Sequence, residues 1–130
     1  MMKIHQYSML CAPITSQAAA IEALRNGATE VEVMRREYAA RRNLMLRGFE
    51  RIGIPCFPPG GAFYLFPDVS KFGLSSQDFA MKFLEAEDVA VVPGTAFGEC
   101  GEGCVRACYA TSRRKLELAL ERLERFVEKL

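Results

Sequence analysis

The amino-acid sequence predicts an α/β fold of the two-layer α+β type: a small mixed sheet of about three to four strands, helices packed on one face, and a long amphipathic helix before them. Three observations support this expectation: a long stretch with helical apolar spacing, three short apolar runs bounded by Gly and Pro, and a leucine-rich final stretch. The 130 residues are half hydrophobic and a quarter charged, which suits one globular domain with its own core.

Two helices are expected in the first half of the chain. The first covers residues 15–24 and follows Pro13, and Gly27 ends it as a C-cap glycine would. Thr29 then offers an N-cap for the long helix, which ends at Gly53. The apolar residues along one face of this long helix are Val31, Met34, Tyr38, Met45, Phe49 and Ile52. The opposite face is dense in charge, so we expect this helix to pack its apolar side on a flat layer.

Three short apolar runs predict strands. The first, Ala62–Phe66, is apolar at every position, which indicates a strand covered on both faces. The second, Val89–Val92, is also expected to be buried and stops before Pro93, and the third is Cys104–Ala110. Between the first two, Ser75 followed by Asp78 three residues later is a variant of the capping box and predicts the start of a helix.

The last helix is predicted to start near Ser112. Its apolar stripe consists of Leu116, Leu120, Leu123, Val127 and Leu130. Such spacing places all five side chains on one face, which is expected to pack on the sheet. From the long helix onward, the order of elements is therefore helix, strand, helix, strand, strand, helix.

Arg106 is the residue with the clearest chemical potential. It lies in the middle of a predicted strand, and alternation places it on one face with Cys104, Cys108 and Ala110. These small neighbours leave room for a ligand, and a partly desolvated guanidinium favours a carboxylate held by two hydrogen bonds. The alternative is a structural ion pair with an acid such as Glu99 or Glu102, and the residues alone give both readings equal weight.

A glycine-punctuated loop, Val92–Gly98, leaves the end of the second predicted strand. Ligands in open α/β sheets favour the carboxyl ends of strands, and glycine permits close approach of a backbone to a ligand. The loop lacks the lysine and the glycine spacing of a phosphate-binding loop. Taken alone, a segment of this kind is more often a turn.

Composition excludes several classes of function. The net charge is +1 with acids and bases interspersed, so nucleic acid is not an expected partner. No apolar run approaches the ~20 residues of a membrane span, and a soluble cytoplasmic protein is expected.

The five cysteines are odd in number and irregularly placed, which favours reduced thiols over a disulfide framework. Cys100, Cys104 and Cys108 are evenly spaced, but His5 is the only histidine. Buried structural thiols are therefore expected there, and no metal site.

Three ordered motifs resemble the C-terminal part of the class I and II, fold type I, aminotransferases, the aspartate aminotransferase-like family. They are Gly60–Tyr64, Val91–Gly98 and Val105–Ser112. The resemblance covers essentially the whole chain. It implies that residues 1–28 are a remnant of the family's large domain and that residues 29–130 are its small domain.

The resemblance also implies roles for particular residues. In the family, the arginine of the last strand pairs with the α-carboxylate of the substrate, and that role falls on Arg106. Phe63 and Gly94, within the first two motifs, are further candidates for substrate contact. Tyr7 and Ser8 fall where the family approaches the active site of the partner subunit in a homodimer. Amino acids and 2-keto acids are the implied substrates.

The family's cofactor is pyridoxal phosphate, held by the lysine of a Ser-x-x-Lys stretch upstream of the region that this chain matches. The chain's own lysines lie in other contexts: Lys3, Lys71, Lys82, Lys115 and Lys129. We therefore expect this chain alone to bind no cofactor and to be inactive, with no catalytic residue of its own. Two alternatives are a stand-alone carboxylate-binding module and a carbon–sulfur lyase of the same fold.

Overall fold

A computed structural model describes residues 1–8 and 10–130, and Met9 lies outside the described residues. The chain divides into two compact units, Met1–Arg36 and Glu37–Leu130. The boundary between these units falls inside the long helix α3 (Ala28–Ile52). The division into a large-domain remnant, residues 1–28, and a small domain, residues 29–130, stays a prediction.

The N-terminal unit contains α1 (Met2–Ser8), α2 (Ile14–Asn26) and the first turns of α3. Neither α1 nor α2 has a buried residue. Gly27 lies between α2 and α3 with a right-handed φ of −81°, so it is not the left-handed cap that the sequence predicted. Because α3 begins at Ala28, before Thr29, the chain continues in helical conformation through the glycine.

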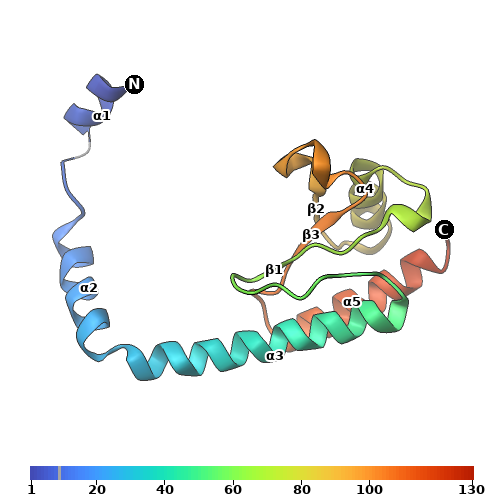
Figure 1. The fold of residues 1–130 in the computed structure, drawn as a ribbon, viewed down its shortest axis with the longest axis horizontal. Coiled ribbons are helices and arrows are strands. Elements are labelled where there is room, and N and C mark those ends of the chain that lie inside the picture. Colours follow the sequence, from blue (N-terminus) through green and yellow to red (C-terminus); the bar gives the residue numbers. More distant parts are fainter. Residues whose placement is uncertain (9) are drawn as a thin grey trace. The chain divides into compact units, whose positions relative to one another are not determined.

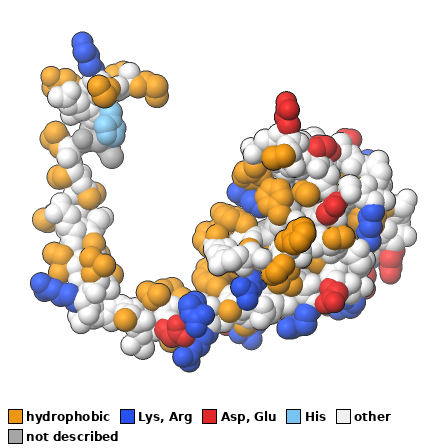
Figure 2. Space-filling model, in the orientation of Figure 1, with side chains coloured by type: hydrophobic (Ala, Val, Ile, Leu, Met, Phe, Trp, Pro, Cys, Tyr) orange, Lys and Arg blue, Asp and Glu red, His pale blue; other side chains and the backbone are white. Residues whose placement is uncertain are grey.

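Large apolar side chains of this unit are exposed, and Figure 2 shows them along the N-terminal helices. They include Ile4, Tyr7, Leu10, Ile14, Ile21, Leu24, Val31 and Met34. A monomeric soluble domain rarely leaves so many apolar groups uncovered. The predicted apolar stripe of α3 is therefore buried only in its second half, where Met45 and Phe49 enter the core of the other unit.

The second unit carries the sheet. Its strands are β1 (Tyr64–Leu65), β2 (Val92–Pro93) and β3 (Val105–Cys108), in the order β1-β3-β2. Both pairings are antiparallel, with Tyr64 opposite Cys108 and Val92 opposite Arg106. The predicted fold class and the number of strands are confirmed, but the sheet is antiparallel and not mixed.

Helices α4 (Ser76–Glu87) and α5 (Arg113–Val127), together with the second half of α3, lie on one side of this sheet (Figure 1). The helices α3 and α5 run side by side in the same direction. Gly48 of α3 faces Leu120 of α5 so closely that an added Cβ would lie 2.4 Å from it. Three short 3₁₀ helices complete the unit: η1 (Ser70–Phe72), η2 (Gly94–Phe97) and η3 (Glu99–Gly101).

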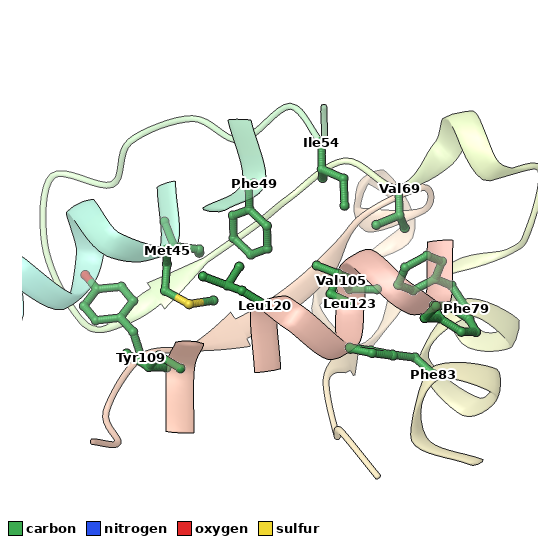
Figure 3. Close-up of a cluster of buried hydrophobic side chains, with 13 residues drawn as sticks. Met45, Phe49, Ile54, Val69, Phe79, Phe83, Val105, Tyr109, Leu120 and Leu123 are labelled. Atoms are coloured by element: carbon green, nitrogen blue, oxygen red, sulfur yellow. The ribbon is translucent and has the colours of Figure 1, made fainter. Parts of the chain in front are cut away.

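The core lies between the sheet and these helices (Figure 3). Its buried side chains are Met45, Phe49, Ile54, Leu65, Val69, Phe79, Phe83, Val105, Tyr109, Leu116, Leu120, Leu123 and Phe126. Burying one such side chain contributes about 1.5–3 kcal/mol. In α5 the predicted stripe is confirmed through Leu123, but Phe126 replaces Val127 as its last fully buried member. Leu130 is exposed because the helix ends at Val127.

The predicted cap at Ser75 and the predicted helix start near Ser112 are confirmed. The Ser75 hydroxyl accepts a hydrogen bond from the Asp78 backbone N–H at 3.0 Å, and Ser112 caps α5 in the same way through Lys115. Capping of this kind contributes about 1 kcal/mol per helix. None of the described helices is long and apolar enough to cross a membrane.

The predicted strand spans are longer than the observed ones. Phe63 and Phe66 are 39% and 37% exposed, so the segment Ala62–Phe66 is not covered on both faces. Its core-facing residue Leu65 is buried, whereas Tyr64 faces the uncovered side. The expected buried strand Val89–Val92 is half-buried or exposed throughout, and its ladder includes only Val92.

Candidate carboxylate-binding site

Strand β3 has one face on the core and an opposite face that is only partly covered. Val105 and Tyr109 are buried on the core face, as alternation predicts. Arg106 lies on the other face and is half-buried. Val92 of β2 is paired with Arg106 and therefore shares its face, and Tyr64 of β1 shares it through its pairing with Cys108.

Two aromatic rings contact the Arg106 guanidinium. Its central carbon, Cζ, lies 4.3 Å from the centroid of the Tyr64 ring and 4.5 Å from that of Phe97. Both distances are within the ~6 Å at which a cation and a ring attract each other. Phe97 in turn meets Phe66 edge-on, with 5.7 Å between the ring centroids. The small strand neighbours therefore do not leave an empty space around Arg106, because aromatic side chains from other segments fill part of it.

The Arg106 guanidinium forms no hydrogen bond or ion pair with another residue in the described part of the chain. Of the acids proposed as structural partners, Glu102 instead accepts a hydrogen bond from the Ser76 backbone N–H at 2.9 Å. Among the described residues, the structural ion pair that the sequence left open is not formed. A half-buried guanidinium without an acid keeps its N–H donors available for an anion.

The loop Val92–Gly98 contributes to this site the ring of Phe97, which contacts Arg106. Gly94 and Gly101 pack backbone against backbone: a Cβ on Gly94 would lie 2.0 Å from the Gly101 carbonyl oxygen, and the reverse distance is 2.1 Å. The Gly94 N–H also donates to the Cys104 carbonyl at 2.8 Å. Gly94 is therefore buried and joins η2 to η3, which fixes the segment that presents Phe97.

The first motif is anchored by Tyr109. Its hydroxyl donates a hydrogen bond to the Ala62 carbonyl at 2.9 Å, and burial raises the pKa of this phenol. Ala62 has a φ of 58°, a left-handed conformation that a residue with a Cβ rarely adopts, and this hydrogen bond helps to hold it. The next residue, Phe63, packs its ring on Tyr38 and Tyr64. Phe63 is therefore next to an aromatic neighbour of Arg106.

Tyr7 and Ser8 are in the N-terminal unit, at the end of α1, and both are exposed. Their proposed approach to a partner subunit stays a prediction. Sequence reasoning missed Tyr64 and Phe97 as neighbours of the arginine. Tyr64 is part of the motif Gly60–Tyr64, and Phe97 is part of the loop Val92–Gly98. Neither segment by itself predicts a contact with Arg106.

The cysteines differ from expectation in burial. Cys100 and Cys108 are exposed and Cys104 is half-buried, because Cys104 and Cys108 lie on the uncovered side of β3. All five cysteines are free in this structure. Burial, together with the charges of Asp68 and Glu102, raises the pKa of the Cys104 thiol, which keeps it in the protonated form that binds metals poorly. No metal-binding group of three or more side chains is found among residues 1–8 and 10–130.

The residues around Arg106 fit the carboxylate of a small molecule better than a large phosphorylated cofactor. They offer one guanidinium and aromatic faces, and two of the five lysines of the chain are engaged elsewhere. The Lys71 ammonium donates to the Gly53 carbonyl at 2.6 Å, and that of Lys129 lies 3.4 Å from a carboxylate oxygen of Glu87.

Comparison with known proteins gives consistent matches. The family model described as "Aminotransferase class I and II" matches residues 1–123. The chain is 51% identical over 129 residues to the Bacillus subtilis (strain 168) protein named "Putative aminotransferase YugH", a match that covers 99% of this chain and 33% of that protein. It is 43% identical to aromatic-amino-acid aminotransferase 2 of Thermococcus litoralis, over 98% of this chain and 33% of that protein.

Solved structures agree with these matches. The aromatic aminotransferase from Pyrococcus horikoshii OT3 has a TM-score of 0.92 at 43% identity, covering 98% of this chain and 34% of its own. The aspartate aminotransferase from Thermus thermophilus with maleate has a TM-score of 0.86 at 38% identity, covering 95% of this chain and 32% of its own. The chain therefore spans about a third of the length of the relatives that it matches.

Proposed function

Because this chain belongs to the class I and II aminotransferase family, we propose that it is the C-terminal, substrate-binding part of an amino-acid aminotransferase. The complete enzyme would transfer an amino group between an amino acid and a 2-keto acid. Its further partners would be a large domain and a second subunit in a homodimer. The exposed apolar side chains of Met1–Arg36 support a packing partner for that unit.

The single observation that carries this function is the setting of Arg106. Its guanidinium is half-buried, lies over two aromatic rings, and has no acidic partner in the described part of the chain. A planar guanidinium matches a carboxylate through two parallel hydrogen bonds. An amino acid and a 2-keto acid share an α-carboxylate, so one arginine can hold both substrates of the reaction. The similar Thermus thermophilus protein was solved with maleate, a dicarboxylate, which is in keeping with a carboxylate ligand.

In this role Arg106 fixes one end of the substrate. Holding the carboxylate restricts rotation of the attached Cα, which favours removal of its proton by a group at a fixed position. Pyridoxal phosphate, when bound in an enzyme of this family, stabilises the negative charge that then develops at Cα. The base would come from outside this chain, so we infer that the chain alone does not transaminate.

Carboxylate binding is tested by titrating the isotope-labelled chain with pyruvate, a small 2-keto acid, and following the Arg106 Nε–H signal by NMR. A charge-assisted hydrogen bond contributes about 1.5–3 kcal/mol, which corresponds to a Kd of about 10–100 mM. We expect a saturable shift in this range at constant ionic strength. Pyruvamide, which has a similar shape but no charge, should give no shift.

Arg106→Ala removes the probe signal, so its effect is read from the neighbouring amides of β3. These should shift with pyruvate in the unsubstituted chain and stay unmoved in Arg106→Ala. The matched control is Arg114→Ala, which removes an exposed guanidinium from the first turn of α5 and should leave the titration unchanged. Equal responses of the three proteins would contradict the proposed function.

The absence of a cofactor site is tested separately. The chain is mixed with pyridoxal phosphate, reduced with borohydride and weighed by mass spectrometry. We expect only scattered, substoichiometric labelling of surface lysines. One stoichiometric adduct at a defined lysine would show that this chain does hold the cofactor.

A further inference from the structure

We infer that Tyr64 and Phe97 are positioning residues for Arg106, whose rings fix the guanidinium without using any of its hydrogen-bond donors. The identity of the ligand, a carboxylate, rests on the proposed function. The geometry of the rings does not depend on it.

The first step is the way in which the guanidinium is held. Tyr64 comes from β1 and Phe97 from η2, and their ring centroids lie 4.3 and 4.5 Å from Cζ of Arg106. The Tyr64 ring packs on the ring of Phe63, and the Phe97 ring packs on the ring of Phe66. Each ring therefore contacts the cation from its own segment, and the guanidinium lies between the two segments.

The second step concerns donors. A half-buried arginine is commonly fixed by an acid, which occupies two of its five N–H donors. Aromatic faces attract the cation through the ring quadrupole and accept none of the in-plane N–H groups when they lie over it. Arg106 therefore stays oriented while the edge of its guanidinium remains free for a ligand. A lysine at position 106 would lose this arrangement, because an ammonium has no plane to stack.

The third step is the support behind the rings. Tyr64 is held by its ladder pairing with Cys108. Two contacts hold Phe97 and the short helix η2 that carries it. On one side, Gly94 is locked against Gly101. On the other, the Phe97 ring meets Phe66 edge-on, at an interplanar angle of 74°. Phe97 is still 50% exposed, so its ring is within reach of a bound ligand as well as of the arginine.

The test measures two signals on the full chain by NMR. The first is the chemical shift of the Arg106 Cδ protons, which rings stacked over the side chain move upfield. The second is the initial slope of the Arg106 Nε–H shift against pyruvate concentration, which is inversely proportional to Kd. The variants are Phe97→Leu and Tyr64→Leu, with Phe97→Tyr as the conservative substitution and Phe57→Leu as the control. Phe57 is 93% exposed and has no part in the site.

We expect Phe97→Leu and Tyr64→Leu each to move the Cδ protons downfield and to lower the pyruvate slope by about two- to five-fold, which corresponds to the loss of one cation–ring contact. Phe97→Tyr should restore both signals, and Phe57→Leu should change neither. Unchanged amide signals in α5 would show that the variants are folded. Failure of both signals to respond to either Leu variant would overturn the positioning role.

The two proposals fail in different ways. If pyruvate moves no β3 signal in the unsubstituted chain, the proposed function fails, while the Cδ shift still reports whether the rings hold Arg106. If pyruvate binds through Arg106 but neither Leu variant alters the Cδ shift or the slope, the proposed function stands and the positioning role is wrong.

Discussion

The close approach of Gly94 and Gly101 predicts a large effect for the substitution Gly94→Ala. The new Cβ would lie 2.0 Å from the Gly101 carbonyl oxygen, about 1 Å inside the 3.0 Å below which real Cβ atoms essentially never come. The obstacle is backbone and cannot rotate away. The two segments must therefore separate by about 1 Å, which would lengthen the 2.8 Å hydrogen bond from the Gly94 N–H to the Cys104 carbonyl beyond a bonding distance.

The magnitude follows from these two losses. A lost hydrogen bond costs about 0.5–1.5 kcal/mol, and forcing a group into a filled site costs about 1–3 kcal/mol. Their sum is about 1.5–4.5 kcal/mol of unfolding free energy. For a domain of this size that corresponds to a fall in Tm of roughly 10–30 °C. Because η2 carries Phe97, the pyruvate response of Arg106 should weaken as well.

Urea unfolding followed by circular dichroism measures the change, with Gly60→Ala as the matched control. Gly60 has open space around its Cβ position, so its substitution should alter stability by less than about 0.5 kcal/mol. If Gly94→Ala were as stable as Gly60→Ala, the backbone contact between η2 and η3 would be refuted.

Three further predictions concern the core, pH and association. Phe79→Ala should lower the unfolding free energy by about 3–5 kcal/mol, because the ring is 1% exposed and contacts three other aromatic rings. Leu84→Ala, on the exposed side of α4, should cost less than about 1 kcal/mol in the same urea assay. The Arg125 guanidinium holds the pKa of the Glu87 carboxyl below its usual value of 4.5. The stabilisation that the ionised Glu87 provides is therefore fully present above pH 4.5 and is lost as the pH falls through the folded-state pKa. The difference in unfolding midpoint between the unsubstituted chain and Glu87→Gln should therefore shrink on acidification below about 4.5, and a constant difference would count against the ion pair. Finally, the exposed apolar groups of Met1–Arg36 predict that the chain self-associates as its concentration rises. Sedimentation velocity should show a smaller oligomer fraction for the double variant Ile21→Glu/Leu24→Glu than for the unsubstituted chain. An unsubstituted chain that stays monomeric at every concentration would disprove this prediction.

Local signals in the sequence predicted the helices of the second unit well. Ser75 could be identified as a cap because capping depends on side chains within three residues of each other. The stripe of α5 was correct as far as Leu123, because helical periodicity alone decides which side chains share a face. These features depend on neighbours along the chain, which a sequence displays directly.

The strands and the details of the site were harder to predict. The apolar content of Ala62–Phe66 suggested a strand that is covered on both faces, but Phe63 and Phe66 are partly exposed. Their coverage depends on which element packs above them, and that information is not contained in the local sequence. Arg106 was identified because a charge in an apolar strand is unusual. Its neighbours Tyr64 and Phe97 were not, because they reach it from two separate segments.

The most direct test of the central claim, that Arg106 holds the substrate carboxylate, is a kinetic measurement in a complete enzyme. The C-terminal third of the Thermococcus litoralis aminotransferase is replaced by this chain, which is 43% identical to it, and kcat/KM is measured with and without Arg106→Ala. Removing one partner of a desolvated charge pair costs about 2–5 kcal/mol, so kcat/KM should fall by between about 30-fold and a few thousand-fold. Arg114→Ala should leave it within about two-fold. A chimera that is active and whose kcat/KM is insensitive to Arg106→Ala would contradict the assignment.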